Sequence, residues 1–279
     1  MPSVFLNGQY VALEDAKISV LDRGFTFADG VYEVIPAYKK KIFFLEEHIN
    51  RLNNSLKAIY MKNPYPLEKW NEILTNLIDS NPDDFQSLYV QVTRGVGERN
   101  HFFQPDMEPT VFILNRTVNT SVYRHGIGAI TREDIRWIRC DIKSIGLLPS
   151  VMLRHEASLE NAQEAILTRD NQVTEGAASN VFVIKDSIVK TPVKNNFILP
   201  GITRDLVVTL LNEAGINCLE TVIHKDELFD ADEIWITSST WEIVPVVSLD
   251  GKPVGDGKPG KLWQRSIDLY QQFKDKQFQ

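Results

Sequence analysis

The first third of the chain reads as short strands separated by tight turns. Residues 4–12 form one strand pattern interrupted by Asn7-Gly8, a dipeptide that favours a two-residue hairpin. A second strand pattern at residues 31–35 turns at residues 39–41 and returns at residues 42–45. Because each turn joins neighbouring strands, the sequence predicts that the fold opens as an antiparallel meander.

Helical patterns alternate with strands in the same region. Residues 46–60 carry Arg51 and place four apolar side chains at the spacing of one helix face: Ile49, Leu52, Leu56 and Ile59. A further helix is expected at residues 67–79, and strands are expected at 87–93 and 110–114 on either side of a loop rich in Gly, Arg, His and Phe. Strands outnumber helices and are joined by hairpins as well as by helices, which indicates an α+β fold.

Residues 115–123 are polar and lack periodicity, so they are the best candidate for a linker. We therefore expect a small domain at residues 1–118, a linker at 119–123 and a larger domain at 124–279. The larger domain begins with a predicted strand near 128–138, a loop through Lys143, a helix near 148–162 and a strand pair within 164–185. It continues with a helix near 202–214, strands near 218–223 and 233–237, a hairpin across Asp250-Gly251 and a final helix.

The composition narrows the range of partners. With 279 residues, 43% of them hydrophobic, the chain can bury a substantial core, and its net charge of -7 argues against nucleic acid and anionic lipid as partners. Its two cysteines, Cys140 and Cys218, lack the paired spacing of a disulfide framework or a zinc site. No leader pattern opens the chain and no stretch is long enough to span a membrane, so we expect a cytoplasmic enzyme.

Lys143 is the first candidate for chemistry. Most lysines of the chain stand in polar runs, whereas Lys143 lies in the stretch 135–148 with apolar residues on both sides. Partial burial favours the neutral amine that attacks an aldehyde, which makes Lys143 a candidate Schiff-base former. The alternative is a structural lysine at a strand end, whose ammonium reaches solvent along its aliphatic stem.

Glu175 is the second candidate. It lies in the stretch 173–182, where a carboxylate precedes small residues and an apolar strand. A carboxylate hydrogen-bonded to a pyridine nitrogen keeps that nitrogen protonated and makes the ring a strong electron sink. For any such residue taken alone, an exposed glutamate in a turn would be the preferred interpretation.

Two segments could bind a phosphate. The turn Pro200-Gly201 leads directly into a predicted helix whose free N–H groups and dipole favour an anion, and Thr203 adds a hydroxyl donor. Residues 237–240 are four consecutive hydroxyl residues at the end of an apolar strand, and they can complete a phosphate cup. The alternatives are an ordinary helix start and a turn that bonds to its own backbone.

Other motifs in the chain do not indicate a function. Gly95-Val-Gly97 lacks the third glycine and the following helix of a dinucleotide-binding fingerprint. The spacing of Gly255, Gly260 and Lys261 matches a phosphate loop, but Leu262 follows where that motif needs Ser or Thr. The histidines have no metal-ligand spacing, so no metal site is expected.

Several segments occur together in the order typical of one enzyme family. They are residues 29–33, 47–52, 141–143, 174–176, 179–182, 201–204 and 237–240. In this order they resemble the fold-type IV enzymes that depend on pyridoxal 5′-phosphate (PLP), over nearly the whole chain. The resemblance implies a small N-terminal α/β domain, a larger C-terminal domain with a β-barrel-like sheet, and the cofactor at the domain interface.

The resemblance also assigns roles to individual residues. It implies that Lys143 is the Schiff-base lysine and later the proton carrier, and that Glu175 holds the pyridine nitrogen. The remaining implied cofactor contacts are phosphate ligands and one residue against the ring: Arg51, Ile202, Thr203, Ser239, Thr240 and, against the ring, Leu199. The sequence departs from the family at Ala177-Ala178, where relatives often carry hydroxyl residues, so these positions offer no side-chain hydrogen bond.

Three further residues indicate a sub-family. In the D-amino-acid enzymes of this family, an Arg-x-His pair and a tyrosine bind the α-carboxylate of the substrate, and Arg99, His101 and Tyr32 match them. Arginine suits this task because its planar fork pairs with a carboxylate through two hydrogen bonds. The alternative is a solvated basic loop. In the family this loop reaches the active site of the other subunit, so the resemblance implies a homodimer.

The resemblance therefore predicts ping-pong transamination between a D-amino acid, of the D-alanine or D-glutamate type, and a 2-oxo acid through a Lys143 Schiff base. Within the family, the alternatives are a branched-chain L-amino-acid aminotransferase and an aminodeoxychorismate lyase, and Arg99 with His101 speaks against both. A non-catalytic PLP-binding protein would keep Arg51 and the phosphate turn. It would not need Tyr32, Arg99 and His101, which together are named the carboxylate trap.

Overall fold

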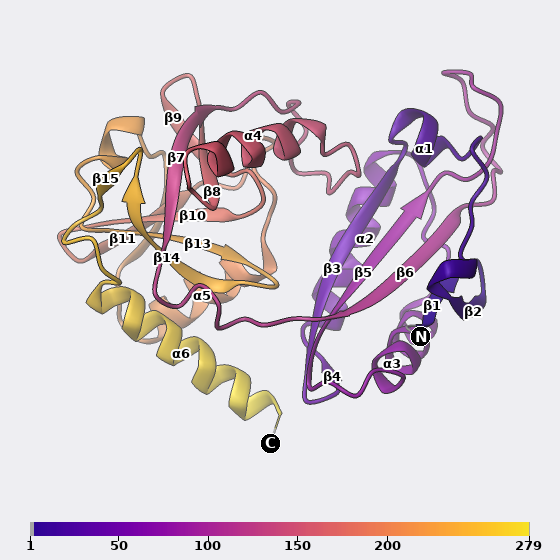
Figure 1. Ribbon diagram of the computed structural model, residues 1–279, viewed down its shortest axis with the longest axis horizontal. Coiled ribbons are helices and arrows are strands. Elements are labelled where there is room, and N and C mark those ends of the chain that lie inside the picture. Colours follow the sequence, from indigo (N-terminus) through magenta and orange to yellow (C-terminus); the bar gives the residue numbers. More distant parts are fainter. Residues whose placement is uncertain (1–2, 279) are drawn as a thin grey trace. The chain divides into compact units, whose positions relative to one another are not determined.

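The computed structural model describes residues 3–278, and the chain divides into two compact units (Figure 1). The first unit comprises the residues up to Asn119 together with Ile142–Gly146. The second comprises Thr120–Asp141 and the residues from Leu147 onward. The short segment that carries Lys143 thus packs with the first unit although the residues flanking it in the chain belong to the second, which is not apparent from the sequence.

The first unit contains a six-stranded antiparallel sheet in the order β2-β1-β6-β5-β3-β4. Its strands are β1 (Ser3–Leu6), β2 (Gln9–Ala12), β3 (Gly30–Tyr38), β4 (Lys41–Ile42), β5 (Phe85–Thr93) and β6 (Thr110–Thr117). The predicted hairpin is confirmed, because φ is 48° at Asn7 and 91° at Gly8, the positive angles that a two-residue turn between twisted strands requires.

Two helices, α2 (Leu45–Ala58) and α3 (Leu67–Asp79), supply the apolar side chains that pack on this sheet (Figure 1). The helices predicted at 46–60 and 67–79 are therefore confirmed. Leu52 and Trp70 from the helices lie in one cluster with Leu88 of β5, and all three are fully buried. Burial of each such side chain contributes roughly 1.5–3 kcal/mol, so this cluster is the main source of stability of the unit.

A short helix, α1 (Arg23–Phe27), precedes β3 and is not apparent from the sequence, because a single helical turn leaves no periodic pattern. The Oδ1 atom of Asp22 caps it by accepting a hydrogen bond from the backbone N–H of Gly24 at 2.7 Å. A 3-10 turn, η1 (Leu13–Asp15), lies earlier in the chain. Together they carry the chain from β2 to the start of β3.

The second unit is built on a nine-stranded mixed sheet that curls into a half-barrel (Figure 1). Its order is β12-β11-β10-β13-β14-β7-β8-β9, and β15 pairs with β14. The strands are β7 (Ile127–Glu133), β8 (Glu164–Arg169), β9 (Gln172–Gly176), β10 (Asn180–Lys185), β11 (Ile188–Pro192), β12 (Cys218–Thr221), β13 (Glu233–Ser238), β14 (Glu242–Leu249) and β15 (Lys252–Pro253). Buried aliphatic residues of the central strands, such as Val181, Ile236 and Val244, form its core.

The helices of the second unit are α4 (Leu148–Leu159), α5 (Ile202–Glu213) and α6 (Lys261–Gln277), with a 3-10 turn, η2 (Lys225–Leu228). Of the residues described, none forms a helix with the length and apolarity that a membrane span requires.

Two strand predictions in the second unit need correction. The strand predicted at 128–138 ends at Glu133, and the side chain of the next residue, Asp134, binds the side chain of Arg136. The pair predicted within 164–185 is three strands. Asp170 and Asn171, at φ of 50° and 60°, make the extra turn between β8 and β9.

Candidate active site

Lys143 lies on an extended segment that runs beside the start of β3. The carbonyl oxygen of Lys143 accepts a hydrogen bond from the backbone N–H of Tyr32 at 2.9 Å, and Ile145 donates to the carbonyl of Gly30 at 3.1 Å. On the helix side, the backbone N–H of Lys143 donates to the Ser55 hydroxyl of α2 at 3.1 Å. The backbone of Lys143 is therefore fixed by both a strand and a helix.

The amine of Lys143 faces the aromatic ring of Tyr32. Its Nζ lies 4.2 Å from the ring centroid, which is within the range of a cation–π interaction. The Tyr32 ring lies 5.7 Å from the ring of Tyr89, whose hydroxyl donates to Gln91 at 2.7 Å. Burial, together with the neighbouring Tyr32, raises the pKa of Tyr89 to about 12. Two residues predicted for the site, Lys143 and Tyr32, therefore lie together, with Tyr89 beside the Tyr32 ring.

Arg51 is part of a buried ion cluster in the same unit. Its guanidinium binds the carboxylate of Glu33 through two hydrogen bonds, Nε to Oε1 at 2.7 Å and Nη2 to Oε2 at 2.8 Å, and Nδ1 of His48 lies 2.8 Å from the same carboxylate. Burial alone would raise the pKa of Glu33, but Arg51 and His48 hold it well below its usual range. Sequence reasoning missed Glu33 and His48, although both lie in the matching segments 29–33 and 47–52.

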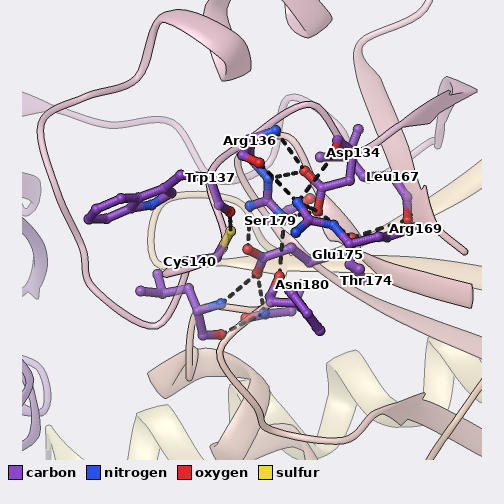
Figure 2. Close-up of polar contacts among 12 residues, drawn as sticks. Asp134, Arg136, Trp137, Cys140, Leu167, Arg169, Thr174, Glu175, Ser179 and Asn180 are labelled. Carbon is purple, nitrogen blue, oxygen red and sulfur yellow. Dashed lines mark hydrogen bonds and ion pairs between the residues drawn. The ribbon is translucent and has the colours of Figure 1, made fainter.

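Glu175 lies on β9 and is buried, so the exposed-turn alternative is excluded. Its Oε2 accepts hydrogen bonds from Nδ2 of Asn180 at 2.9 Å and from the backbone N–H of Leu199 at 3.0 Å. Its Oε1 accepts a hydrogen bond from Nη1 of Arg136. The side chains of Glu175, Asn180 and Arg136 point toward one another in Figure 2. The structure thus brings Glu175 and Leu199 into direct contact, as two of the predicted cofactor contacts.

Two factors act on the pKa of Glu175 in opposite directions: burial, which favours the neutral acid, and Arg136, which favours the carboxylate. Burial raises the pKa of Glu175 to about 7, while Arg136 acts to lower it. Arg136 is itself held by Asp134, through Nε and Nη2 at 2.9 Å each, and Asp134 also binds the Thr174 hydroxyl at 3.0 Å (Figure 2). Arg136 is half-buried and is not identified from the sequence, but an arginine within an apolar stretch needs a carboxylate partner, and that requirement was a usable signal.

The predicted phosphate turn begins α5. Gly201 is the N-cap of α5 and no side chain caps the helix, so the first N–H groups after it, from Ile202 onward, are available to an anion. A Cβ atom on Gly201 would come within 1.9 Å of Oδ1 of Asn180, so this position requires glycine. Thr203 is buried at the helix start, and Leu199 precedes the turn.

Ser239 and Thr240 lie in the turn between β13 and β14 and are half-buried. Thr237, at the end of β13, has a buried hydroxyl oxygen without a hydrogen-bond partner among the described residues. A buried hydroxyl that lacks a partner costs roughly 1–3 kcal/mol, which a ligand can recover.

The alanines at 177 and 178 are followed by Ser179, whose hydroxyl donates to Oε2 of the buried Glu164 at 2.9 Å. Ser179 is therefore engaged with a carboxylate in the described structure. Glu164 is held in addition by the backbone N–H of Ala165 at 3.0 Å.

Arg99 and His101 are exposed on the loop between β5 and β6. Both contact the ring of Phe27, at 5.3 Å and 5.6 Å between centres. Within residues 3–278, no contact is found that joins either of them to Tyr32. The structure thus brings two members of the predicted trap together but not the third.

Over the described range, no group of three or more His, Cys, Asp or Glu side chains is placed to hold a metal ion. Cys140 and Cys218 are free and buried, and burial raises the pKa of each thiol to about 11. Neither cysteine is poised to react.

Comparison with known proteins decides the family. The profile of the family described as amino-transferase class IV matches residues 30–249. The chain belongs to the class IV aminotransferases. This aminotransferase is 39% identical to the D-alanine aminotransferase of Staphylococcus aureus (strain COL) over 277 residues, 98% of each chain. It is 41% identical to the D-alanine aminotransferase of Bacillus licheniformis over 261 residues, 93% of this chain and 92% of the relative.

Solved structures give the same family. The branched-chain amino acid aminotransferase from Escherichia coli matches with a TM-score of 0.88 and 28% identity, over 96% of this chain and 92% of that one. The T.th. branched-chain amino acid aminotransferase complexed with N-(5′-phosphopyridoxyl)-L-glutamate matches with a TM-score of 0.87 and 27% identity, over the same shares. The predicted α+β fold of type IV, with its barrel-like second sheet, is confirmed.

Class IV aminotransferases depend on PLP, and the residues of this aminotransferase fit that cofactor. Glu175 is a buried carboxylate whose pKa of about 7 suits a proton shared with a ring nitrogen. The uncapped start of α5 and the unpartnered hydroxyl of Thr237 offer donors to a phosphate.

Proposed function

We propose that this enzyme transfers the amino group between D-amino acids, of the D-alanine and D-glutamate type, and 2-oxo acids. The observation that carries the proposal is Lys143, whose backbone is fixed on both sides and whose amine lies 4.2 Å from the centre of the Tyr32 ring. The D-alanine aminotransferase relatives, at 39% and 41% identity, support the choice of enantiomer.

Bound PLP supplies an aldehyde carbon for the amine of Lys143 and a pyridine ring that accepts electrons. The amine of Lys143 would hold the cofactor and, once released by the amino group of the substrate, would act as base and acid. Lys143 would take the proton from the substrate Cα as a base and would return a proton as an acid to complete the transfer of nitrogen. The first half-reaction releases the substrate as a 2-oxo acid. A second 2-oxo acid then takes up the amino group by the reverse half-reaction, which gives ping-pong kinetics.

Glu175 holds a proton at the pyridine nitrogen. A carboxylate with a pKa of about 7 can share that proton near neutral pH, and Arg136 stabilises its ionised form. The backbone N–H of Leu199 and the amide of Asn180 orient the carboxylate. The side chain of Leu199 would pack against the ring.

Phosphate binding is proposed for Arg51, Ile202, Thr203, Ser239 and Thr240. The start of α5 supplies N–H groups and the positive end of the helix dipole to the anion. Arg51 already binds Glu33, so its charge is held in place by a buried carboxylate that stays ionised. A pre-oriented guanidinium binds an anion with less loss of conformational entropy than a mobile one.

The substrate carboxylate is proposed to bind Tyr32, Arg99 and His101, the last two contributed by a second subunit. Arg99 and His101 are exposed, which suits residues presented to another chain. The exposed face of α4 supports a homodimer as well. Leu148, Val151, Met152 and Leu159 lie on it at helical spacing, and their exposed fractions are 70%, 61%, 48% and 70%. A cytoplasmic location stays a prediction.

The proposal is tested by mixing the PLP-loaded enzyme with D-alanine or with L-leucine and following the absorbance of the bound cofactor. D-alanine should convert the cofactor to its amine form, and L-leucine should not. Lys143→Ala, as the control, should show no conversion with either amino acid. Faster conversion by L-leucine would favour a branched-chain L-aminotransferase, and no conversion by any amino donor would favour a PLP-binding protein without this activity.

A further inference from the structure

The loop between β5 and β6, residues 95–109 and here named the trap loop, is held at both ends by two consecutive residues. Where the loop begins, the carbonyl of Gly95 accepts a hydrogen bond from the backbone N–H of Arg23 at 2.8 Å. Where it ends, the hydroxyl of Thr110 donates to Asp22 at 2.6 Å. The other oxygen of Asp22 caps α1 at Gly24, so a single buried carboxylate joins the loop end to this helix.

The side chain of Arg23 also reaches the middle of the trap loop. Its Nη1 donates to the carbonyl oxygen of Asn100 at 2.6 Å, and Asn100 stands between Arg99 and His101 in the sequence. Its Nε donates to Oδ2 of Asp29 at 2.8 Å. Arg23 is 4% exposed, so this guanidinium is a fixed internal support rather than a solvated side chain.

Asp29 and Arg94 brace that support. Arg94 donates to the two carboxylate oxygens of Asp29 at 2.7 Å and 2.9 Å, and its guanidinium lies 3.7 Å from the ring centroid of Phe103 in the trap loop. Burial alone would raise the pKa of Asp29, but Arg94 and Arg23 hold it below its usual value, so the carboxylate stays ionised at neutral pH. The loop is thus anchored on both sides of His101, at Asn100 and at Phe103.

The ring of Phe27 in α1 lies close to two side chains of the trap loop, Arg99 and His101. The guanidinium of Arg99 lies 5.3 Å from the Phe27 ring centroid and the imidazole of His101 lies 5.6 Å from it. The guanidinium of Arg23 lies 4.6 Å from the same ring. Exposed arginine and histidine side chains sample many rotamers in water, and a shared ring restricts them to fewer.

We propose that α1 is the support that positions Arg99 and His101, with Arg23 and Phe27 as positioning residues for recognition of the substrate α-carboxylate. This inference rests on the proposed function, because it takes Arg99 and His101 to be the carboxylate ligands. Arg23 sets the backbone between them, and Phe27 sets the direction of both side chains. Neither residue touches the reacting atoms, so their loss weakens carboxylate binding more than it slows the proton transfer.

The test uses the PLP-loaded enzyme and the half-reaction with D-alanine, in which the apparent dissociation constant and the maximal rate are separate measurements. Phe27→Leu keeps an apolar residue but removes the ring, and Phe27→Tyr restores the ring. Arg23→Lys keeps the charge but cannot donate to Asn100 and Asp29 with one planar group. Phe25→Leu is the matched control, because Phe25 lies on the same helix with 72% of its surface exposed.

Phe27→Leu and Arg23→Lys should each raise the apparent dissociation constant for D-alanine about five- to tenfold and change the maximal rate less than about twofold. The inhibition constant of propionate, a carboxylate without an amino group, should rise by the same factor. Phe27→Tyr should restore both constants, and Phe25→Leu should leave them unchanged. For Phe27→Leu and Phe27→Tyr, the cofactor absorbance and the melting temperature should be those of the parent enzyme, since a purely structural defect would move the melting temperature first.

A double substitution separates this inference from the function on which it rests. In an Arg99→Ala background, Phe27→Leu should raise the dissociation constant by a smaller factor than in the parent enzyme, because only His101 remains for the ring to position. A full additional loss in that background would overturn the inference, as would unchanged constants for D-alanine and propionate in both Phe27→Leu and Arg23→Lys. If Arg99→Ala itself leaves D-alanine and propionate binding intact, the proposed carboxylate trap fails and the inference falls with it.

Discussion

Glu33 in the first unit and Glu175 in the second are both buried carboxylates that bind an arginine, yet their acidities move in opposite directions. The pKa of Glu33 lies well below its usual range, whereas that of Glu175 is raised to about 7. Glu33 receives two hydrogen bonds from Arg51 and one contact from His48. Glu175 receives one from Arg136, whose Nε and Nη2 also donate to the second carboxylate, Asp134.

The difference shows that burial does not decide the role of a carboxylate. A buried acid with its own arginine stays ionised and acts as an anchor, whereas one that shares its arginine with a second carboxylate can take up a proton near neutral pH. The first arrangement suits the support of Arg51. The second suits a residue that shares a proton with a cofactor nitrogen.

The largest loss of activity is expected from substitution of Lys143, the residue of the first unit that is proposed to carry out the reaction. Lys143→Ala should abolish transamination while PLP still binds through the phosphate contacts, which do not depend on this amine. Multiple turnover is measured with D-alanine and a 2-oxo acid, and PLP binding is measured by absorbance after gel filtration. Normal multiple turnover without an added amine would falsify the assignment.

Glu33→Gln should destabilise the protein by about 3–5 kcal/mol, because it leaves Arg51 buried beside a neutral amide. Urea unfolding at pH 7 measures the loss. Glu72→Gln is the control, because its ion pair with Lys69 is exposed on α3 and should be worth little. A cost at Glu33 as small as at Glu72 would mean that the cluster is not an anchor.

The two carboxylates should give opposite pH dependences of stability. Glu175 has a raised pKa, so its contribution is fully present below about pH 4.5 and is lost as pH rises through about 7, a change on the order of 3 kcal/mol. Glu33 has a lowered pKa, so its contribution is present above its unfolded value and is lost as pH falls below about 4.5. Urea unfolding of cofactor-stripped protein from about pH 3 to about pH 8, with Glu175→Gln and Glu33→Gln as references, separates the slopes. If the contributions of Glu33 and Glu175 to the free energy of unfolding changed with pH in the same direction, the contrast between the two carboxylates would be wrong.

Glu175→Gln should slow the first half-reaction about tenfold or more, because a loss of ~1.4 kcal/mol of transition-state stabilisation gives that factor. Its effect on stability should be small beside that of Glu33→Gln, because the fold already disfavours the ionised carboxylate. Stopped-flow absorbance measures the rate, and an unchanged rate would count against the role at the pyridine nitrogen.

The smallest change is expected from Asp134→Asn. Without this carboxylate, Glu175 is the one carboxylate of the pair that remains bound to Arg136. The substitution also removes a negative charge that raises the pKa of Glu175. In the cofactor-stripped protein, the midpoint of the pH-dependent stability change should therefore move to lower pH. A midpoint that stays in place would show that burial alone sets the acidity of Glu175.

The sequence by itself determined the elements and the chemistry-bearing residues. The Asn7-Gly8 turn, the helices that became α2, α3 and α5, and the candidates Lys143 and Glu175 all follow from local rules, since turn dihedrals, helical periodicity and side-chain chemistry depend on neighbours in the chain. The order of the motifs was enough to indicate the family.

Only the tertiary structure decided which residues meet. The Lys143 segment packs with the first unit, Arg136 binds Glu175 from 39 positions away, and Arg23 reaches Asn100 across 77 positions. A single-turn helix such as α1 and a shared arginine leave no periodic pattern in the sequence. Their effects depend on burial and on distances between groups that are remote in the chain, and both arise only when the chain has folded.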